Sequence, residues 1–145
     1  MLKACQLAEQ GLSANEIAQQ VTDLVSKSHA SFVINTLEFL RAGGRCSALA
    51  AFGANLLGIK PSIKVDNQDG GKMNVGKKYR GRYDQVILSY VKDTLARYPD
   101  YDDEIVFITH SGTKKEYINA VRKYLKENTT FKNIYITQAS CTISC

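Results

Sequence analysis

Residues 37–61 read LEFLRAGGRCSALAAFGANLLGIKP. The pattern predicts a short amphipathic helix, then a hinge, then a second helix that is apolar on almost every face. Gly43 and Gly44 stand where the end of a helix favours a residue that tolerates positive φ. The hinge also carries a cation, Arg45, and a hydroxyl, Ser47. The stretch therefore predicts two helices joined at a polar hinge.

The hinge is a candidate anion site. Arg45 and Ser47 fall beside the N-terminus of the second helix, where unpaired N–H groups and the helix dipole attract negative charge. The small, apolar walls behind this polar end suit a ligand with an anionic head and a hydrocarbon tail. A purely structural interpretation stays open, in which the glycines only end a helix and Arg45 binds a carbonyl or carboxylate of its own chain.

A longer pattern in the same stretch resembles a known family. It comprises Leu37, Leu40, Gly43, Gly44, Arg45 and Ser47, followed by Ala50, Gly53, Leu56, Leu57, Ile59, Lys60 and Pro61. This pattern is similar to that of the DegV family, the bacterial fatty-acid-binding proteins. The resemblance covers nearly the whole chain and matches the second, two-layer α/β domain of that family.

The resemblance implies a function and a set of site residues. Family members bind a long-chain fatty acid and present its carboxyl group to an ATP-dependent kinase, which makes acyl phosphate, so they are carriers with no catalytic residues. We expect Gly44, Arg45 and Ser47 to serve the carboxylate. A helix that is apolar all round must be covered on more than one side, so we expect the hydrocarbon tail to lie along it. The residues expected to line the tail are Leu40, Leu49, Phe52 and Leu56.

The resemblance also implies that the chain is one piece of a longer protein. We expect residues 1–145 to form a single α/β domain, the C-terminal lipid-binding domain of a two-domain protein. The family's N-terminal domain, whose Thr and Ser hold the carboxylate, is missing from the sequence. So is the histidine-glycine-proline segment expected after Cys145. An isolated copy should therefore hold at best half of the ligand site.

Composition narrows the protein class. With 44% hydrophobic and 23% charged residues, the 145-residue chain is typical of a globular protein. No apolar run approaches the roughly 20 residues that span a bilayer, and no signal peptide begins the chain, so a cytoplasmic location is expected. The four cysteines lack metal-ligand spacing, which predicts free thiols and no metal site. His110-Ser111-Gly112 is either a second anion niche or only a turn.

Positive charge is concentrated in one segment. The net charge is +5, and the segment 60–82 alone holds seven basic and two acidic residues, a difference of five. Lys78-Tyr79-Arg80 resembles the family's Lys-x-Arg segment, so we expect Arg80, helped by Lys78 and Arg82, to contact the kinase partner.

Other functions remain open for these residues. One alternative is a nucleic-acid-binding module in which Tyr79 and Tyr83 stack on bases, although nucleic acid is the less favoured partner. Another is a small enzyme that uses Arg45 as a phosphate cradle. A third is a solvated hairpin with no binding role.

Periodicity along the chain predicts an α/β fold: a two-layer domain with a mixed β-sheet covered by helices. Capping boxes predict helix starts at Ser13–Glu16 and Thr113–Glu116. The apolar run Ile105–Thr109 predicts a central strand buried on both faces. The full order of expected elements is a helix ending near Gly11, a helix to about Ser28, a strand at 31–35, the two helices of the hinge, a β-hairpin at 59–78, a helix at 83–98, the strand at 105–109, a helix to about 128 and a strand at 134–137.

Overall fold

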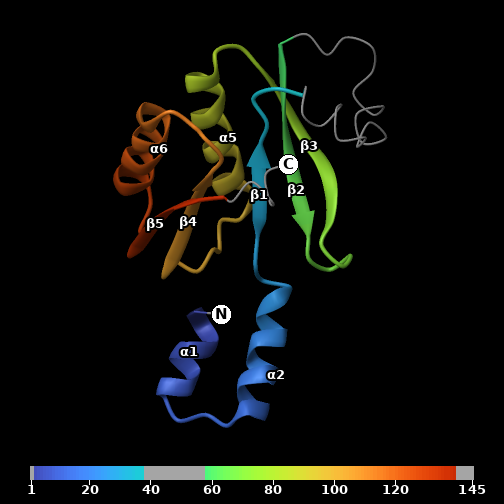
Figure 1. The fold of residues 1–145 in the computed structure, drawn as a ribbon, viewed down its shortest axis with the longest axis vertical. Helices are drawn as coiled ribbons and strands as arrows, with labels where there is room; N and C mark the ends of the chain where they lie inside the picture. The colour runs from blue at the N-terminus through green and yellow to red at the C-terminus, as the bar shows by residue number, and fades with distance from the viewer. Residues whose placement is uncertain (1, 38–57, 140–145) are drawn as a thin grey trace. The chain divides into compact units, whose positions relative to one another are not determined.

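A computed structural model describes residues 2–37 and 58–139 of the chain. The chain forms two compact units, one of Met1–Phe32 with Ile63–Gly76 and the other of Val33–Ser62 with Lys77–Cys145. The described strands lie in two sheets, a three-stranded sheet in the order β1-β2-β3 and a two-stranded sheet of β4 and β5 (Figure 1). The presence of helices together with these two sheets confirms the α/β fold class. The single domain expected over 1–145 stays a prediction.

A helical hairpin begins the first unit. Helix α1 (Leu2–Glu9) and helix α2 (Ala14–Val25) contact each other (Figure 1), and Gly11 between them has φ 85°. The capping box before α2 is confirmed: the backbone N–H of Glu16 donates to Ser13 Oγ over 3.5 Å, and the backbone N–H of Ser13 donates to a Glu16 carboxylate oxygen over 2.8 Å. These bonds satisfy N–H groups that have no partner within the helix.

The predicted hairpin is present. Strand β2 (Ile59–Asp66) and strand β3 (Lys72–Arg80) are neighbours, and β2 lies between β1 (Ala30–Val33) and β3. Gly70 and Gly71 have φ of 59° and 82°, conformations that only glycine adopts readily, and the Gly71 N–H donates to the Asp66 carbonyl over 2.8 Å. Pro61, third in β2, is buried and accepts a hydrogen bond from the Ile34 N–H through its carbonyl, the one backbone group that proline offers.

The second unit contains a parallel crossover. Strand β4 (Ile105–His110) pairs in parallel with β5 (Asn133–Gln138), and helix α6 (Lys115–Asn128) connects them. Helix α5 (Tyr83–Arg97) contacts α6, and α6 contacts β4 (Figure 1). The buried apolar side chains of these helices are Val86, Ile118, Val121 and Leu125, and the last three are three and four positions apart, the spacing of one helix face.

Two local predictions are wrong. Helix α6 begins one residue later than its sequence pattern indicates, because the N-cap is Lys114, whose side chain makes no capping bond, and this leaves Thr113 outside the cap. Strand β4 is not buried on both faces, since 51% of Phe107 is exposed. The Phe107 ring stacks on Tyr135 of β5, with centroids 5.5 Å apart, so the aromatic pair shields part of its own apolar surface.

The packing of α6 yields a stability prediction. Leu125 is 3% exposed, so Leu125→Ala should lower the free energy of unfolding by about 2–5 kcal/mol, through lost burial and a residual cavity. Urea unfolding followed by circular dichroism measures this change. Lys126→Ala, at an exposed position one residue further along, is the matched control and should change little. A loss below about 1 kcal/mol for Leu125→Ala would contradict the assignment of Leu125 to the core.

Candidate functional site

The sequence-predicted site residues divide into two groups. The residues assigned to the ligand, Leu40, Gly44, Arg45, Ser47, Leu49, Phe52 and Leu56, lie outside the described residues, so their roles stay predictions. The residues assigned to a partner, Lys78, Arg80 and Arg82, lie at the end of β3 and just after it. This basic strand end lies wholly within the described residues.

The alternation of side chains along β3 places Tyr79 on one face of the strand and its two neighbours on the other. Tyr79 is 7% exposed and contacts α5, whereas its neighbours Lys78 and Arg80 are exposed. Successive side chains of a strand point to opposite faces. Lys78 and Arg80 therefore lie on the face of the strand away from α5. Because Tyr79 is buried against α5, the two cations beside it are exposed on the outer face of the strand.

One carboxylate oxygen on α5 anchors the inner face. Asp93 Oδ2 accepts a hydrogen bond from the Tyr79 hydroxyl over 2.8 Å and pairs with Lys77 Nζ over 2.8 Å. The Lys77 ammonium lies 5.5 Å from the centroid of the Tyr79 ring, and that ring meets the Tyr90 ring of α5 edge to face, with the two centroids 6.4 Å apart. Hydrogen bonds to an ionised group are among the stronger polar contacts in proteins. The end of β3 is thus tied to the middle of α5.

The contacts change the titration of both groups that meet at this oxygen. The hydrogen bond from Lys77, followed by the one from Tyr79, lowers the pKa of Asp93 and keeps its carboxylate ionised. Burial, and then the hydrogen bond to Asp93, raises the pKa of Tyr79, so its hydroxyl stays protonated as the donor. The two shifts describe one arrangement, in which an ionised acceptor faces two protonated donors.

The cations of this segment differ in their partners. Lys77 pairs with Asp93, and Arg82 pairs with Asp84 in the first turn of α5 over 2.8 Å, with 80% of its side chain exposed. Arg80 is exposed and has no hydrogen-bond or ion-pair partner among residues 2–37 and 58–139. Exposed pairs such as Arg82–Asp84 contribute little to stability, so they do not prevent Arg82 from contacting a partner. Arg80 is the cation with the most freedom to do so.

The two tyrosines proposed to stack on bases are both engaged in packing. The Tyr79 ring is buried against α5, and the half-buried Tyr83 ring meets Tyr117 of α6 edge to face, with centroids 5.4 Å apart. Burial raises the pKa of Tyr83. Base stacking needs an exposed ring face. This arrangement therefore disfavours the nucleic-acid interpretation of the basic segment.

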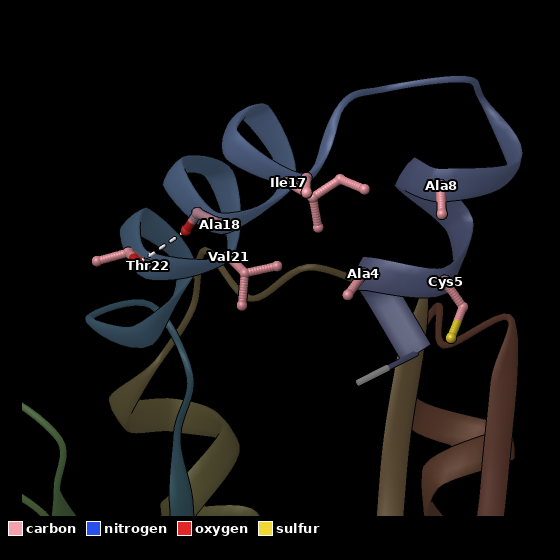
Figure 2. Close-up of a pocket in the computed structure, with 8 residues that line it drawn as sticks. Ala4, Cys5, Ala8, Ile17, Ala18, Val21 and Thr22 are labelled. Carbon is pink, nitrogen blue, oxygen red and sulfur yellow. Dashed lines mark hydrogen bonds between the residues drawn. The ribbon is translucent and has the colours of Figure 1, made fainter.

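The first unit has an apolar groove that the sequence analysis did not identify. It has a volume of about 570 Å³ and is formed by α1 and α2 (Figure 2). The apolar side chains of Ile17 and Val21 line it together with Ala4 and Ala8 of the facing helix. Ile17 and Val21 are four positions apart, the spacing of one helix face, but nothing local in the sequence indicates that α1 faces them. The remaining lining residues are Cys5, Ala14, Ala18 and Thr22.

His110 lies at the carboxyl end of β4, before α6. Its Nδ1 is buried and has no hydrogen-bond partner among the described residues, and Gly112 turns the chain with φ 64°. The anion niche considered for this triplet stays a prediction. No group of His, Cys, Asp and Glu side chains within residues 2–37 and 58–139 is arranged to hold a metal ion, and no helix in those ranges is long and apolar enough to cross a membrane.

The sequence matches one protein family and several curated relatives. The model of the family described as "Uncharacterised protein, DegV family" matches residues 1–145. A DegV domain-containing protein of Caldanaerobacter subterraneus is 28% identical over 145 residues, which cover 99% of this chain and 49% of the relative. Another from Clostridium acetobutylicum is 35% identical over 64% of the chain and 33% of the relative. The chain thus spans about half the length, or less, of these relatives.

Solved structures share the fold. A DegV family protein from Thermus thermophilus, described as fatty-acid binding, superposes with a TM-score of 0.78 at 20% identity, over 99% of this chain and 50% of that one. A DegV family protein from Eubacterium eligens loaded with heptadecanoic acid gives 0.77 at 20%, over 97% and 49%. The Fatty Acid Kinase (Fak) B3 protein of Streptococcus pneumoniae, loaded with linoleic acid, gives 0.78 at 22%, over 98% and 48%.

The lowered pKa of Asp93 predicts how acid affects stability. A carboxyl group with a lower pKa in the folded state stabilises the protein above its unfolded pKa of about 4, and this contribution is lost as the pH falls through that value and below it. Unfolding by urea between pH 7 and pH 3 should therefore show a shallower loss of stability for Asp93→Asn than for the wild type. The same slope in both proteins would contradict the ionised, doubly bonded state of Asp93.

Proposed function

Because the chain belongs to the DegV family, we propose that it binds a long-chain fatty acid and presents the carboxyl group to a fatty acid kinase for acyl-phosphate formation. The observation that carries the proposal is the match of the family model to all 145 residues. It is supported by solved proteins of the same fold whose descriptions name bound fatty acids and, in one case, a fatty acid kinase. Since this chain covers about half of those proteins, the proposal concerns the intact protein in the cytoplasm.

The polar hinge supplies the chemistry for the ligand's head. A fatty-acid carboxylate is an anion, and the guanidinium of Arg45, the hydroxyl of Ser47 and the backbone at Gly44 offer donors to it. The hydrocarbon chain would lie along Leu40, Leu49, Phe52 and Leu56, where burial of each methylene stabilises the complex by about 0.8 kcal/mol. The ligand itself is the only bound group that the proposal requires, with no cofactor or metal.

The reaction takes place on the partner. A carboxylate oxygen of the bound fatty acid attacks the γ-phosphorus of ATP, the bond from that phosphorus to the β,γ-bridging oxygen breaks, and ADP leaves with the electron pair. The kinase supplies the nucleotide and the groups that stabilise the developing charge. This chain's part is to hold the carboxyl group where the kinase reaches it, so we assign it no catalytic residue.

The basic end of β3 is the proposed partner surface, defined as Lys78, Arg80 and Arg82. The exposed cations of this surface lie on or beside a strand end whose inner face is fixed to α5 by Asp93. A surface of one sign steers association with an acidic partner and fixes its orientation. Arg80 is the strongest candidate in this surface because no described residue neutralises it.

The head-group role of Arg45 predicts a loss of affinity. Arg45→Ala in the intact protein should weaken binding of oleate by about 1.5–3 kcal/mol, the range for hydrogen bonds to charged groups. Isothermal titration calorimetry measures the affinity. Arg122→Ala, which removes an exposed arginine of α6, is the matched control and should bind like the wild type. An unchanged affinity for Arg45→Ala with the fold intact would leave Arg45 as a structural residue.

The partner role of Arg80 predicts a different outcome. Arg80→Glu should slow acyl-phosphate formation and flatten its dependence on salt, because it reverses a charge that steers the encounter, while oleate affinity stays the same. Arg122→Glu changes the net charge by the same amount on an exposed helix and should leave the rate unchanged. If oleate binding falls instead, Arg80 belongs to the ligand site, and if nothing changes it has no binding role.

A further inference from the structure

We propose that Asp93 is a positioning residue for the partner surface: its carboxylate holds the inner face of β3 on α5 and so fixes the direction in which Lys78 and Arg80 project. The inference rests on the proposed function, since it concerns the surface that meets the kinase. It adds a residue of α5 that does not itself contact the partner, and that lies 13 positions after Arg80 in the sequence.

Asp93 binds two residues that lie on the same face of β3. Lys77 and Tyr79 are two positions apart in β3, and both bind the same oxygen, Asp93 Oδ2, at 2.8 Å. Residues two apart share one face of a strand, while the residue between them and the residue after them share the other. Holding Lys77 and Tyr79 on α5 therefore determines the face on which Lys78 and Arg80 stand.

Asp93 lies far along α5 from the point at which the chain passes from β3 into the helix. Strand β3 ends at Arg80, Gly81 turns the chain with φ 115°, and α5 begins at Tyr83. Asp93 is ten residues into the helix, about 15 Å along its axis at 1.5 Å per residue. The connection of Gly81 and Arg82 joins strand to helix at one point, and the Asp93 contacts join them at a second. Together with the pairing of β3 and β2, these two separated attachments restrain the orientation of the strand end.

The negative charge of Asp93 affects both Lys77 and Tyr79. Asp93 is ionised and lies on the inner side, where it neutralises Lys77 and keeps that cation out of the outer surface. The Tyr79 hydroxyl, on a residue that is 7% exposed, needs an acceptor, and Asp93 supplies it. Without the carboxylate, a buried hydroxyl and a lysine both lose their partner, and an unpaired buried donor is costly. The strand end would then shift to recover hydrogen bonds, and Arg80 would shift with it.

A double-mutant cycle between Asp93 and Arg80 tests the role. The intact protein is loaded with oleate, and the KM and kcat of acyl-phosphate formation are measured with the purified fatty acid kinase of the source organism. Asp93→Ala should raise the KM for the loaded protein roughly three- to tenfold, since misdirected charges steer less well, with kcat and oleate affinity unchanged. In an Arg80→Ala background, Asp93→Ala should raise KM less than about twofold, because the residue through which it acts is gone.

Two further variants separate positioning from folding. Asp93→Asn keeps an oxygen that accepts from Tyr79 and should retain a KM closer to that of the wild type than Asp93→Ala does. Glu127→Ala removes an acid on the exposed face of α6, where its carboxylate lies 3.8 Å from the ammonium of Lys123, and should leave KM unchanged. If Asp93→Ala fails to fold, the Asp93→Asn and Tyr79→Phe variants complete the cycle with Arg80→Ala.

The outcomes distinguish this inference from the proposed function. An equal rise in KM for Asp93→Ala with and without Arg80 would overturn the positioning role, because it would show that the two residues act independently. An unchanged KM for both Asp93 variants would overturn it as well, while leaving the proposed function in place. If the wild-type protein supports no acyl-phosphate formation, the proposed function fails, and the positioning role fails with it.

Discussion

A single carboxylate oxygen fixes the end of β3 on α5. Asp93 Oδ2 binds Lys77 and Tyr79 together, and through them it sets the inner and outer faces of β3. Tyr79 is buried at this contact, and its ring meets the Tyr90 ring edge to face. The basic end of the strand thereby becomes two-sided, with Lys77 paired to the helix and Lys78 and Arg80 on the outer face.

Local patterns predicted most of the described elements, because local forces form them. The bonds between Ser13 and Glu16 and the positive φ of Gly71 are decided by residues a few positions apart. The stripe on α6 that includes Leu125 follows from the helical period. Helix α6 begins one residue later than the pattern predicts. The pattern shows that Thr113 could cap a helix, but it does not determine which residue takes the cap conformation.

The remaining features depend on contacts that no local pattern contains. Phe107 belongs to an apolar run, yet whether a strand is covered on one face or two depends on its neighbouring layers. Asp93 looks in the sequence like a solvated acid on an amphipathic helix, and only the fold brings it to a lysine 16 positions earlier. The sequence also allows Tyr79 to stack on bases, and its burial disfavours that interpretation. The ligand residues around Arg45 were assigned by resemblance and lie outside the described residues.

The two proposed tasks, holding a fatty acid and meeting the enzyme that modifies it, belong to different stretches of the chain. The central proposal is that the intact protein carries a fatty acid, and mass spectrometry of lipid extracted from protein purified out of its native cells tests this directly. We expect a long-chain fatty acid in equimolar amount with the protein. Purified protein that carries no lipid, or that carries a nucleic acid or a phosphorylated small molecule in its place, would contradict it.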